Sequence, residues 1–136
     1  MNIFDLVKSL APEHTVIITD MQGEDTGERF TLHSPTSGVM VKAFDAYLFA
    51  SGKVQRDNKE LHAKCQELGD FTEYNAIAKD EFAKLDRAFA ITCVAGWSMD
   101  DPATEENIGK LLDQLPYLIE LIGNAAWAAK IGEAKK

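Results

Sequence analysis

Cysteine is scarce in this 136-residue chain, which contains only Cys65 and Cys93. Both fall in segments whose apolar periodicity predicts helices, and no other feature is typical of an exported disulfide protein. We therefore predict that both thiols are reduced and buried. A disulfide is also unnecessary, because a domain of this length can bury roughly two-thirds of the surface that its unfolded chain exposes.

Basic residues are outnumbered, with 14 Lys and Arg against 22 Asp and Glu and a net charge of -8. The electric field of a protein with this negative charge repels nucleic-acid phosphates and anionic lipid headgroups, so neither is an expected partner. Long hydrophobic runs are also missing. The longest apolar segment, residues 115–129, is interrupted by Glu120 and Asn124, and it is shorter than the about 20 residues that a helix needs to cross a bilayer. The start of the chain lacks the basic leader and apolar core of a signal peptide, and we expect a cytoplasmic protein.

Catalytic and metal-binding motifs are absent as well. The sequence has no GxSxG, P-loop, HExxH or GxGxxG pattern, and its three histidines are scattered. His62 and Cys65 share a helix face and could supply two metal ligands, but a structural zinc site needs four and no second cluster supplies the others. A small hydrolase or metal-dependent enzyme built on this pair is the least favoured hypothesis. We predict no catalytic residue, no cofactor and no metal.

The N-terminal part of the chain predicts a short helix followed by a β-hairpin. Residues 1–12 alternate small apolar pairs with polar residues and end at a proline, which is typical of a short amphipathic helix. The β-branched run 14–20 and the alternating run 29–34 predict two strands. Gly23 and Gly27 bracket the acidic loop between them and supply positive-φ positions at both ends of the turn.

A long helix is predicted next. Ser34 is its expected N-cap and Pro35 its first residue. One face of this helix repeats with spacings of four and three, as when a helix packs along a partner helix. The members of this face are Met40, Phe44, Tyr47, Ser51, Val54, Asn58, Leu61, Cys65 and Leu68. Polar Ser51 and Asn58 on the face, with Gly52 beside it, predict that the middle of the helix either kinks or faces solvent where the partner helix ends.

A second stripe follows Gly69 and predicts the partner helix of an antiparallel helical hairpin. Its members are Phe71, Tyr74, Ala78, Phe82, Leu85, Phe89 and Thr92. We expect this helix to run through Cys93 and to end at Gly96, in the left-handed conformation that glycine favours at helix ends.

Two shorter helices complete the predicted fold. Thr104 should cap the first, with acidic residues in the first turn at the positive end of the helix dipole. The second, residues 116–131, is apolar around most of its circumference, so it must be covered on more than one side. The fold class is therefore α+β and predominantly α-helical. A single domain of residues 1–136 is expected, with the first helix and hairpin at about 1–34, the helical part at about 35–131 and a short charged tail at 132–136.

Charged and aromatic residues are distributed unevenly. Residues 97–124 carry six carboxylates against one lysine, whereas residues 40–65 have a net charge of +2. The two regions could attract each other between copies and form a homo-oligomer, modestly because exposed ion pairs contribute only about 0 to 1 kcal/mol each. The alternative is that both are ordinary solvated faces. Trp97 either plugs the gap beneath its loop or forms the rim of a partner site, and Trp127 has the same two interpretations.

Several motifs occur together in a fixed order. They are the strand-to-helix junction Thr-Leu-His-Ser-Pro, the long helical hairpin, Val-Ala-Gly-Trp before an acidic loop, Thr104-x-x-Asn107, and a last helix that begins Pro-Tyr-Leu. In this order the chain resembles the tail assembly chaperones of long-tailed phages and prophages. The resemblance covers most of the chain and is most specific over residues 93–129.

The resemblance implies a noncatalytic chaperone that binds the long, helical tape measure protein, keeps it soluble and helps to recruit tail tube subunits. The candidate partner contacts are Trp97, Asp100, Asp101, Glu105, Leu121 and Trp127. The acidic residues among them are also explained by a solvated loop and helix capping. The alternative function is a helical adaptor or regulatory protein-binding module of a bacterial host.

Overall fold

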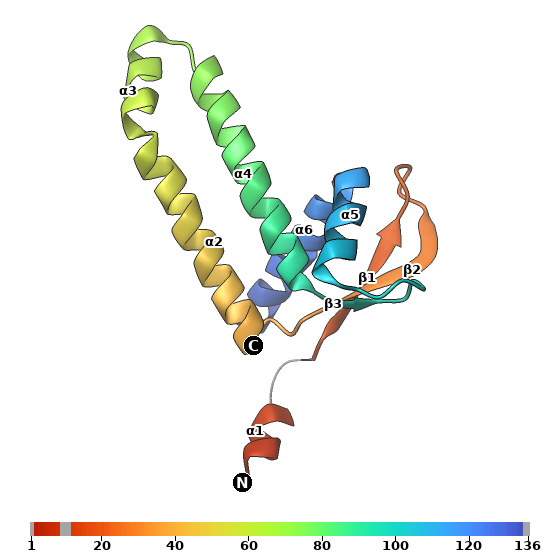
Figure 1. Cartoon of the computed structure of the whole chain (residues 1–136). Helices are drawn as coiled ribbons and strands as arrows, with labels where there is room; N and C mark the ends of the chain where they lie inside the picture. Colours follow the sequence, from red (N-terminus) through yellow and green to blue (C-terminus); the bar gives the residue numbers. More distant parts are fainter. Residues whose placement is uncertain (1, 9–11, 135–136) are drawn as a thin grey trace.

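The computed structural model describes residues 2–8 and 12–134. In chain order its elements are α1 (Ile3–Lys8), β1 (His14–Thr19), β2 (Asp25–Leu32), α2 (Gly38–Asp57), α3 (Lys59–Leu68), α4 (Thr72–Cys93), β3 (Val94–Trp97), α5 (Glu105–Gln114) and α6 (Tyr117–Ala134). The predicted class, α+β and predominantly helical, is confirmed. Figure 1 shows a body made of the sheet, α5 and α6, from which α2, α3 and α4 project as a helical hairpin; α1 stands apart from both.

The β-hairpin forms where it was predicted, although its second strand begins earlier. The side chain of Asp20 accepts hydrogen bonds from the backbone nitrogens of Gln22 (2.9 Å) and Glu24 (3.0 Å), which closes the turn. Gly23 and Gly27 have φ of +83° and +86°, so both expected positive-φ positions are confirmed. Gly27 lies within β2, not at the end of the loop as predicted.

A third strand replaces the predicted helix end at Gly96. Residues 94–97 form β3, which pairs antiparallel with β2 so that Phe30 faces Trp97 and Thr31 faces Gly96. Positive φ among the described residues is confined to three other glycines, so the left-handed assignment of Gly96 was wrong. The reason is tertiary, because the free edge of β2 satisfies backbone groups that a helix end would leave unpaired.

The start of α2 lies three residues later than predicted. Ser37 is the N-cap, and its hydroxyl oxygen accepts a hydrogen bond from the backbone nitrogen of Met40 at 3.3 Å. Ser34 is buried before the helix, where its carbonyl accepts a hydrogen bond from the Ser37 hydroxyl at 2.7 Å. The assignment of Ser34 and Pro35 to the helix start was therefore wrong. In contrast, the Thr104 cap on α5 is confirmed, with 3.2 Å from the Asn107 nitrogen to the Thr104 hydroxyl.

The predicted long helix is interrupted at Asn58, which separates α2 from α3. Asn58 has φ -108° and ψ 15°, and its side-chain amide donates to the Val54 carbonyl at 2.8 Å. An asparagine side chain that bonds the local backbone in this way competes with the helical ladder. The prediction of an interruption is thus confirmed, at Asn58 and not at Gly52. Gly69, with φ +71°, ends α3 in the left-handed conformation.

The hydrophobic core lies at the base of the helical hairpin, where the sheet, α4, α5 and α6 meet. Its fully buried members include Phe30, Leu32, Met40, Phe44, Cys93, Ile108, Leu112, Leu118 and Ile122. Both cysteines are free and buried, as predicted. α6 extends to Ala134, so residues 132–134 of the expected tail are helical, while residues 135–136, like residues 9–11 of the expected first helix, lie outside the described residues.

Candidate docking surfaces

The pair that suggested a metal site does not form one in the described part of the chain. No group of three or more His, Cys, Asp or Glu among residues 2–8 and 12–134 is placed to hold a metal ion. The His62 ring instead packs edge-on against Tyr74, with 4.9 Å between ring centroids, and Cys65 is buried in α3. Over the same residues, no helix combines the length and the apolar character that crossing a membrane requires.

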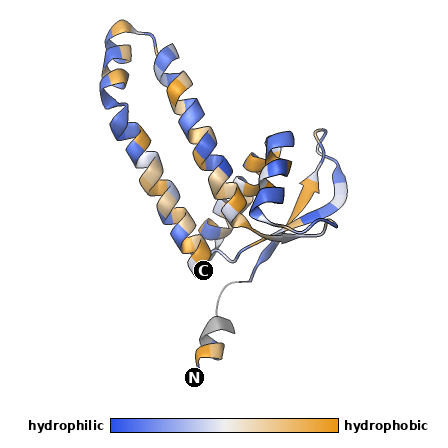
Figure 2. Cartoon of the chain, viewed as in Figure 1, coloured by the Kyte–Doolittle hydropathy of each residue, from blue (hydrophilic) through white to orange (hydrophobic). Residues whose placement is uncertain are grey.

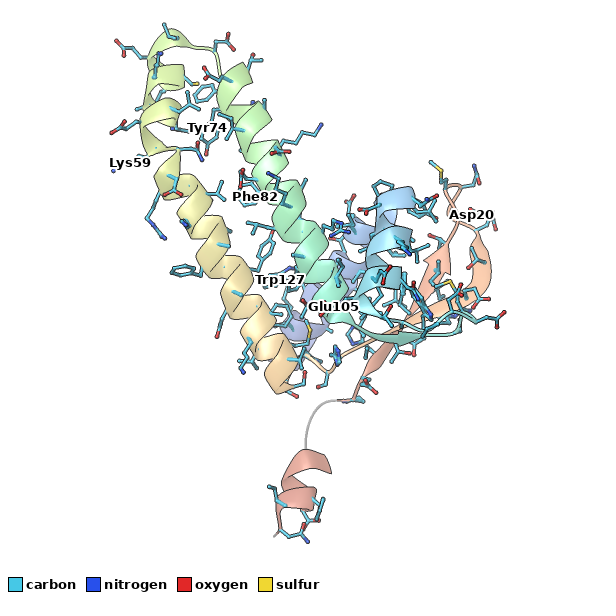
Figure 3. All side chains as sticks on the ribbon, in the orientation of Figure 1. Asp20, Lys59, Tyr74, Phe82, Glu105 and Trp127 are labelled. Carbon is cyan, nitrogen blue, oxygen red and sulfur yellow. The ribbon has the colours of Figure 1, made fainter. Side chains whose placement is uncertain are left out.

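An aromatic cluster joins α6 to the base of the helical hairpin. Trp127 stacks on Phe89 of α4, with ring centroids 5.7 Å apart, and contacts Phe44 of α2 at 4.7 Å. The ammonium group of Lys130 lies 4.6 Å from the centre of the Phe44 ring, over its face. Figure 3 shows Trp127 at this base and Tyr74 near the distal end of the hairpin. Trp127 therefore covers one face of the hairpin from α6.

Tyr47 also belongs to this cluster, because its ring packs against Phe89 and Trp127, and a partly buried hydrogen bond holds it in place. The Tyr47 hydroxyl donates to the Asp86 carboxylate at 2.7 Å, which ties α2 to α4. Burial, then the hydrogen bond to Asp86, and last the negative charge of Asp86 raise the pKa of Tyr47 to about 12, so Tyr47 stays neutral and remains the donor. Next to it, Trp127 and Glu120 line an open groove of about 690 Å³ between α4 and α6.

The other face of the hairpin is uncovered and lined by small side chains. Here α2 and α4 alone form a groove of about 230 Å³, which we name the alanine groove. Its lining residues are Ala43, Ala46, Tyr47, Ala50, Leu85, Ala88, Phe89 and Thr92. Alanines on both walls keep the two helix backbones accessible, as in interfaces where a further helix packs closely. In Figure 2 the half of α2 nearest the sheet is mainly apolar, whereas the turns toward α3 are mainly hydrophilic.

The side of α2 that faces away from the core carries an exposed aromatic among positive charges. Phe49 is 71% exposed, and the guanidinium carbon of Arg56 lies 6.0 Å from the centre of its ring. Lys42 and Lys53, seven residues before and four after Phe49, fall on the same helix face, which also carries the exposed carboxylate of Asp45, four residues before Phe49. Within the described residues, none of these three cations forms an ion pair. We name Lys42, Phe49, Lys53 and Arg56 the Phe49 strip.

Trp97 lies in a pocket on the opposite part of the molecule. Its ring packs on Phe30, with 6.4 Å between centroids, and its indole nitrogen donates to the Asp101 carbonyl. The ring is half-buried, and beside it lies a pocket of about 300 Å³, named the Trp97 pocket. Its lining residues are Trp97, Met99, Asp101, Asn107, Lys110, Leu111 and Gln114. Trp97 thus packs against Phe30 beneath its loop and also lines an open pocket, and its contact with a partner stays a prediction.

The six candidate contacts separate into two groups. Trp97 and Asp101 line the Trp97 pocket, while Asp100 and Glu105 are exposed in the adjoining loop and at the start of α5. Leu121 and Trp127 belong to α6 and pack against the core. None of the six lies in the alanine groove.

The helix patterns did not predict the alanine groove, because its seam residues Tyr47, Leu85, Phe89 and Thr92 were expected to be covered by the partner helix. The Phe49 strip lies outside the predicted seam. Leu48 and Phe49, two apolar residues outside the seam of the first helix, were the available signal. They mark a helix that is apolar on more than its core-facing side.

These surfaces define an α+β protein with apolar grooves of the kind that receive segments of other proteins. Residues 3–135 match the model of a family described as phage tail assembly chaperone, and the chain belongs to this family. Searches among curated proteins and among solved structures found no match. Membership gives the protein a role in phage tail assembly with protein partners, in agreement with the resemblance noted in the sequence and in preference to a host adaptor.

Proposed function

We propose that the protein binds a helical segment of the tape measure protein in the alanine groove, in the cytoplasm of the host cell. It keeps this long chain soluble until the tail tube forms, helps to recruit tube subunits, and makes or breaks no covalent bond. The observation that carries the proposal is the apolar groove on the uncovered face of the hairpin, in a chain that belongs to a tail assembly chaperone family.

The chemistry of the groove supports an amphipathic helix as its occupant. An incoming helix can place apolar side chains over Tyr47 and Phe89, and its backbone can approach the alanines on both walls. The covered face offers a precedent within the same molecule, because α6 already packs on the hairpin through Trp127. A bound helix would give the hairpin a second cover and would shield the apolar face of the tape measure segment from aggregation.

The six partner contacts expected from the sequence lie outside the alanine groove, so we propose other roles for them. Trp97, Asp100, Asp101 and Glu105 are proposed as protein contacts outside the alanine groove, where tube subunits or another copy of the chain could dock. Trp127 is proposed to act on the partner through the groove between α4 and α6 that it lines. Contact of Leu121 with a partner stays a prediction, since its side chain packs against the core.

Co-expression with the tape measure protein of the same phage tests the proposal. The variant Ala46→Arg with Ala88→Arg fills the groove from both walls, and both positions are exposed, so the fold should survive. We expect the wild-type chain to co-purify with a soluble tape measure protein, and the variant to recover about tenfold less of it, which corresponds to about 1.4 kcal/mol.

The matched control is Ala128→Arg, which makes the same substitution at an exposed alanine of α6 outside the groove. This variant should recover as much tape measure protein as the wild type. If wild type and groove variant are equally effective, the groove assignment is wrong. If the wild type does not co-purify with the tape measure protein and leaves it insoluble, the whole proposal fails. Addition of purified tube protein to the complex then tests recruitment by pull-down.

A further inference from the structure

α1 is a short helix that the fold leaves exposed. Its apolar residues Ile3 and Phe4 are 69% and 72% exposed, and in Figure 1 the helix stands apart from the rest of the molecule. Isolated helices shorter than about 12 residues are marginal in water, because few hydrogen bonds offset the ordering of the first turn. A helix of six residues with exposed apolar side chains therefore needs a surface on which to pack.

The first turn of α1 nevertheless holds the helix in shape. The Asn2 side chain accepts a hydrogen bond from the Asp5 backbone nitrogen at 3.0 Å, and the Asp5 carboxylate accepts one from the Asn2 backbone nitrogen at 3.1 Å. This reciprocal pairing has the geometry of a capping box, which satisfies backbone donors that a helix start leaves free. α1 is thus a preformed apolar helix, which is the kind of ligand that an apolar groove receives.

The alanine groove matches α1 in length and in character. Six helical residues extend about 9 Å, and the groove wall from Ala43 to Ala50 extends about 10 Å along α2. Among the described residues, no charged side chain lines the alanine groove, whereas the groove between α4 and α6 includes Lys79, Asp86 and Glu120. An apolar helix face loses less hydration of charged groups in the alanine groove, so this groove is the better site.

The alanine groove also lies within reach of α1. His14, the first residue of β1, pairs with Leu32, and Leu32 pairs with Val94, so His14 and Val94 lie about 10 Å apart. Thr92, at the end of the groove nearest the sheet, is two residues before Val94 and hence within about 17 Å of His14. Lys8 and His14 are six positions apart, a length of chain that spans up to about 20 Å. The C-terminal end of α1 can therefore reach Thr92.

We propose that α1 folds back into the alanine groove of its own chain and occupies it until a partner helix takes its place. Phe4 then packs between Ala46 and Ala88, and Ile3 lies near Ala50. The docking of α1 stands on the geometry alone, whereas the identity of the competing helix rests on the proposed function. A partner that displaces α1 binds with an apparent affinity reduced to the fraction of chains whose groove is open.

Disulfide trapping in the purified full chain tests the docking without the tape measure protein. Ile3→Cys with Ala50→Cys should form a disulfide within one chain under mild oxidation, which a non-reducing gel shows as a faster-migrating monomer. Burial raises the pKa of the native Cys93 to about 12, and Cys65 is also buried, so neither native thiol competes.

Two further variants sharpen the trapping experiment. Phe4→Asp added to the same pair removes the proposed apolar contact and should slow disulfide formation about tenfold. Ile3→Cys with Ala83→Cys, at an exposed alanine of the groove between α4 and α6, should be equally slow. The docking is overturned if the Ala50 pair forms no disulfide, if the Ala83 pair reacts as fast, or if Phe4→Asp has no effect. A cross-linked dimer as the product would also overturn it, because α1 would then occupy another copy.

Competition for the tape measure protein tests the displacement. The wild type and the variant Ile3→Asp with Phe4→Asp, carrying different tags, are co-expressed with a limiting amount of tape measure protein. With α1 in the groove of about nine chains in ten, the variant should recover about tenfold more of it than the wild type. Leu68→Asp with Ile131→Asp adds the same charges at exposed positions outside the groove and should share equally with the wild type.

The two experiments separate this inference from the proposed function. Equal recovery by the wild type and by Ile3→Asp with Phe4→Asp would overturn displacement of α1 by the tape measure protein. Absence of tape measure protein from both chains would contradict the proposed function, and the disulfide between positions 3 and 50 would still decide whether α1 docks.

Discussion

The base and the distal end of the helical hairpin are built from the same two chain segments, yet they differ in how they are held. At the base, α2 and α4 bury Phe44 and Phe89 and are covered by α6 through Trp127. At the distal end, among the described residues, α3 buries only Cys65, and Leu68 near its end is 70% exposed. Helix pairs without a third layer bury little apolar surface, so the distal end should open locally before the base unfolds.

The helix binding that we propose requires a firm surface, and the alanine groove lies on the part of the hairpin that the core supports. The distal end lies beyond the interruption at Asn58 and contributes no residue to the groove. The predictions that follow test this division between a rigid base and a weakly held distal end.

The largest effect is expected from a charge in the core of the base. Ile122 of α6 is fully buried, so Ile122→Asp should destabilise the fold by more than about 4 kcal/mol and unfold most of the protein. Circular dichroism would show loss of helix, with sedimentation reporting the size of the product. Ile131→Asp, at an exposed position of the same helix, should change the midpoint of unfolding very little. A folded, soluble monomer from Ile122→Asp would show that α6 is an interface and not core.

The second largest effect is expected at Phe44, and Phe49 of the same helix provides the comparison. Phe44→Ala removes a buried ring that contacts Phe89 and Trp127, and it should lower the free energy of unfolding by about 3 to 5 kcal/mol. Phe49→Ala removes an exposed ring and should stay within about 0.5 kcal/mol of the wild type. Urea unfolding at low protein concentration, where copies are separate, measures both. Equal losses would contradict the assignment of Phe49 to the surface.

A smaller and local effect is expected at the distal end. Cys93→Ser and Cys65→Ser make the same change at the base and in α3, each placing a hydroxyl in a buried site, which costs about 1 to 3 kcal/mol. At Cys93 the loss should lower the global midpoint of thermal unfolding, because this residue belongs to the core. At Cys65 it should appear as faster amide hydrogen exchange in α3 with a nearly unchanged midpoint. A global loss from Cys65→Ser would mean that the hairpin unfolds as one unit with the body.

The smallest effect is a pH dependence at His14, where β1 joins the base. Burial lowers the pKa of His14 below 6.5, and neither ring nitrogen makes a normal hydrogen bond within the described residues, although the Ala125 backbone lies close enough to oppose the shift in part. The contribution of this histidine is therefore complete above pH 6.5, and it is lost as the pH falls, because the unfolded chain takes up the proton first.

Urea unfolding at pH 7.5 and 5.5 checks this, with His14→Gln expected to flatten the difference. Asp25 and Asp113, whose hydrogen bonds to Arg29 and Arg87 lower their pKa values, act below 3.8 and do not interfere. An unchanged pH difference in His14→Gln would assign the effect to another group.

Much of the fold followed from local patterns in the chain. The seam from Met40 to Leu68 predicted the antiparallel hairpin, because helix periodicity depends on residues three and four apart, although Leu68 itself is exposed. Thr104 predicted the start of α5, since a cap satisfies backbone groups of its own helix, and Gly69 marked the boundary between the two predicted long helices. The end of α4 was mispredicted because Val94–Trp97 pairs with a strand more than 60 residues away in the sequence, and no local pattern carries that information.

The sequence by itself determined the fold class, the order of the helices and the resemblance to tail assembly chaperones, because periodicity, capping and motif order are local properties. Only the tertiary structure decided which apolar residues face the core and which remain accessible. Phe44 lies on the predicted seam and Phe49 lies outside it, but only the structure shows that Phe44 packs under Trp127 and that Phe49 stays exposed beside Arg56. The surfaces proposed to bind partners come from that difference, since burial depends on elements brought together from distant parts of the chain.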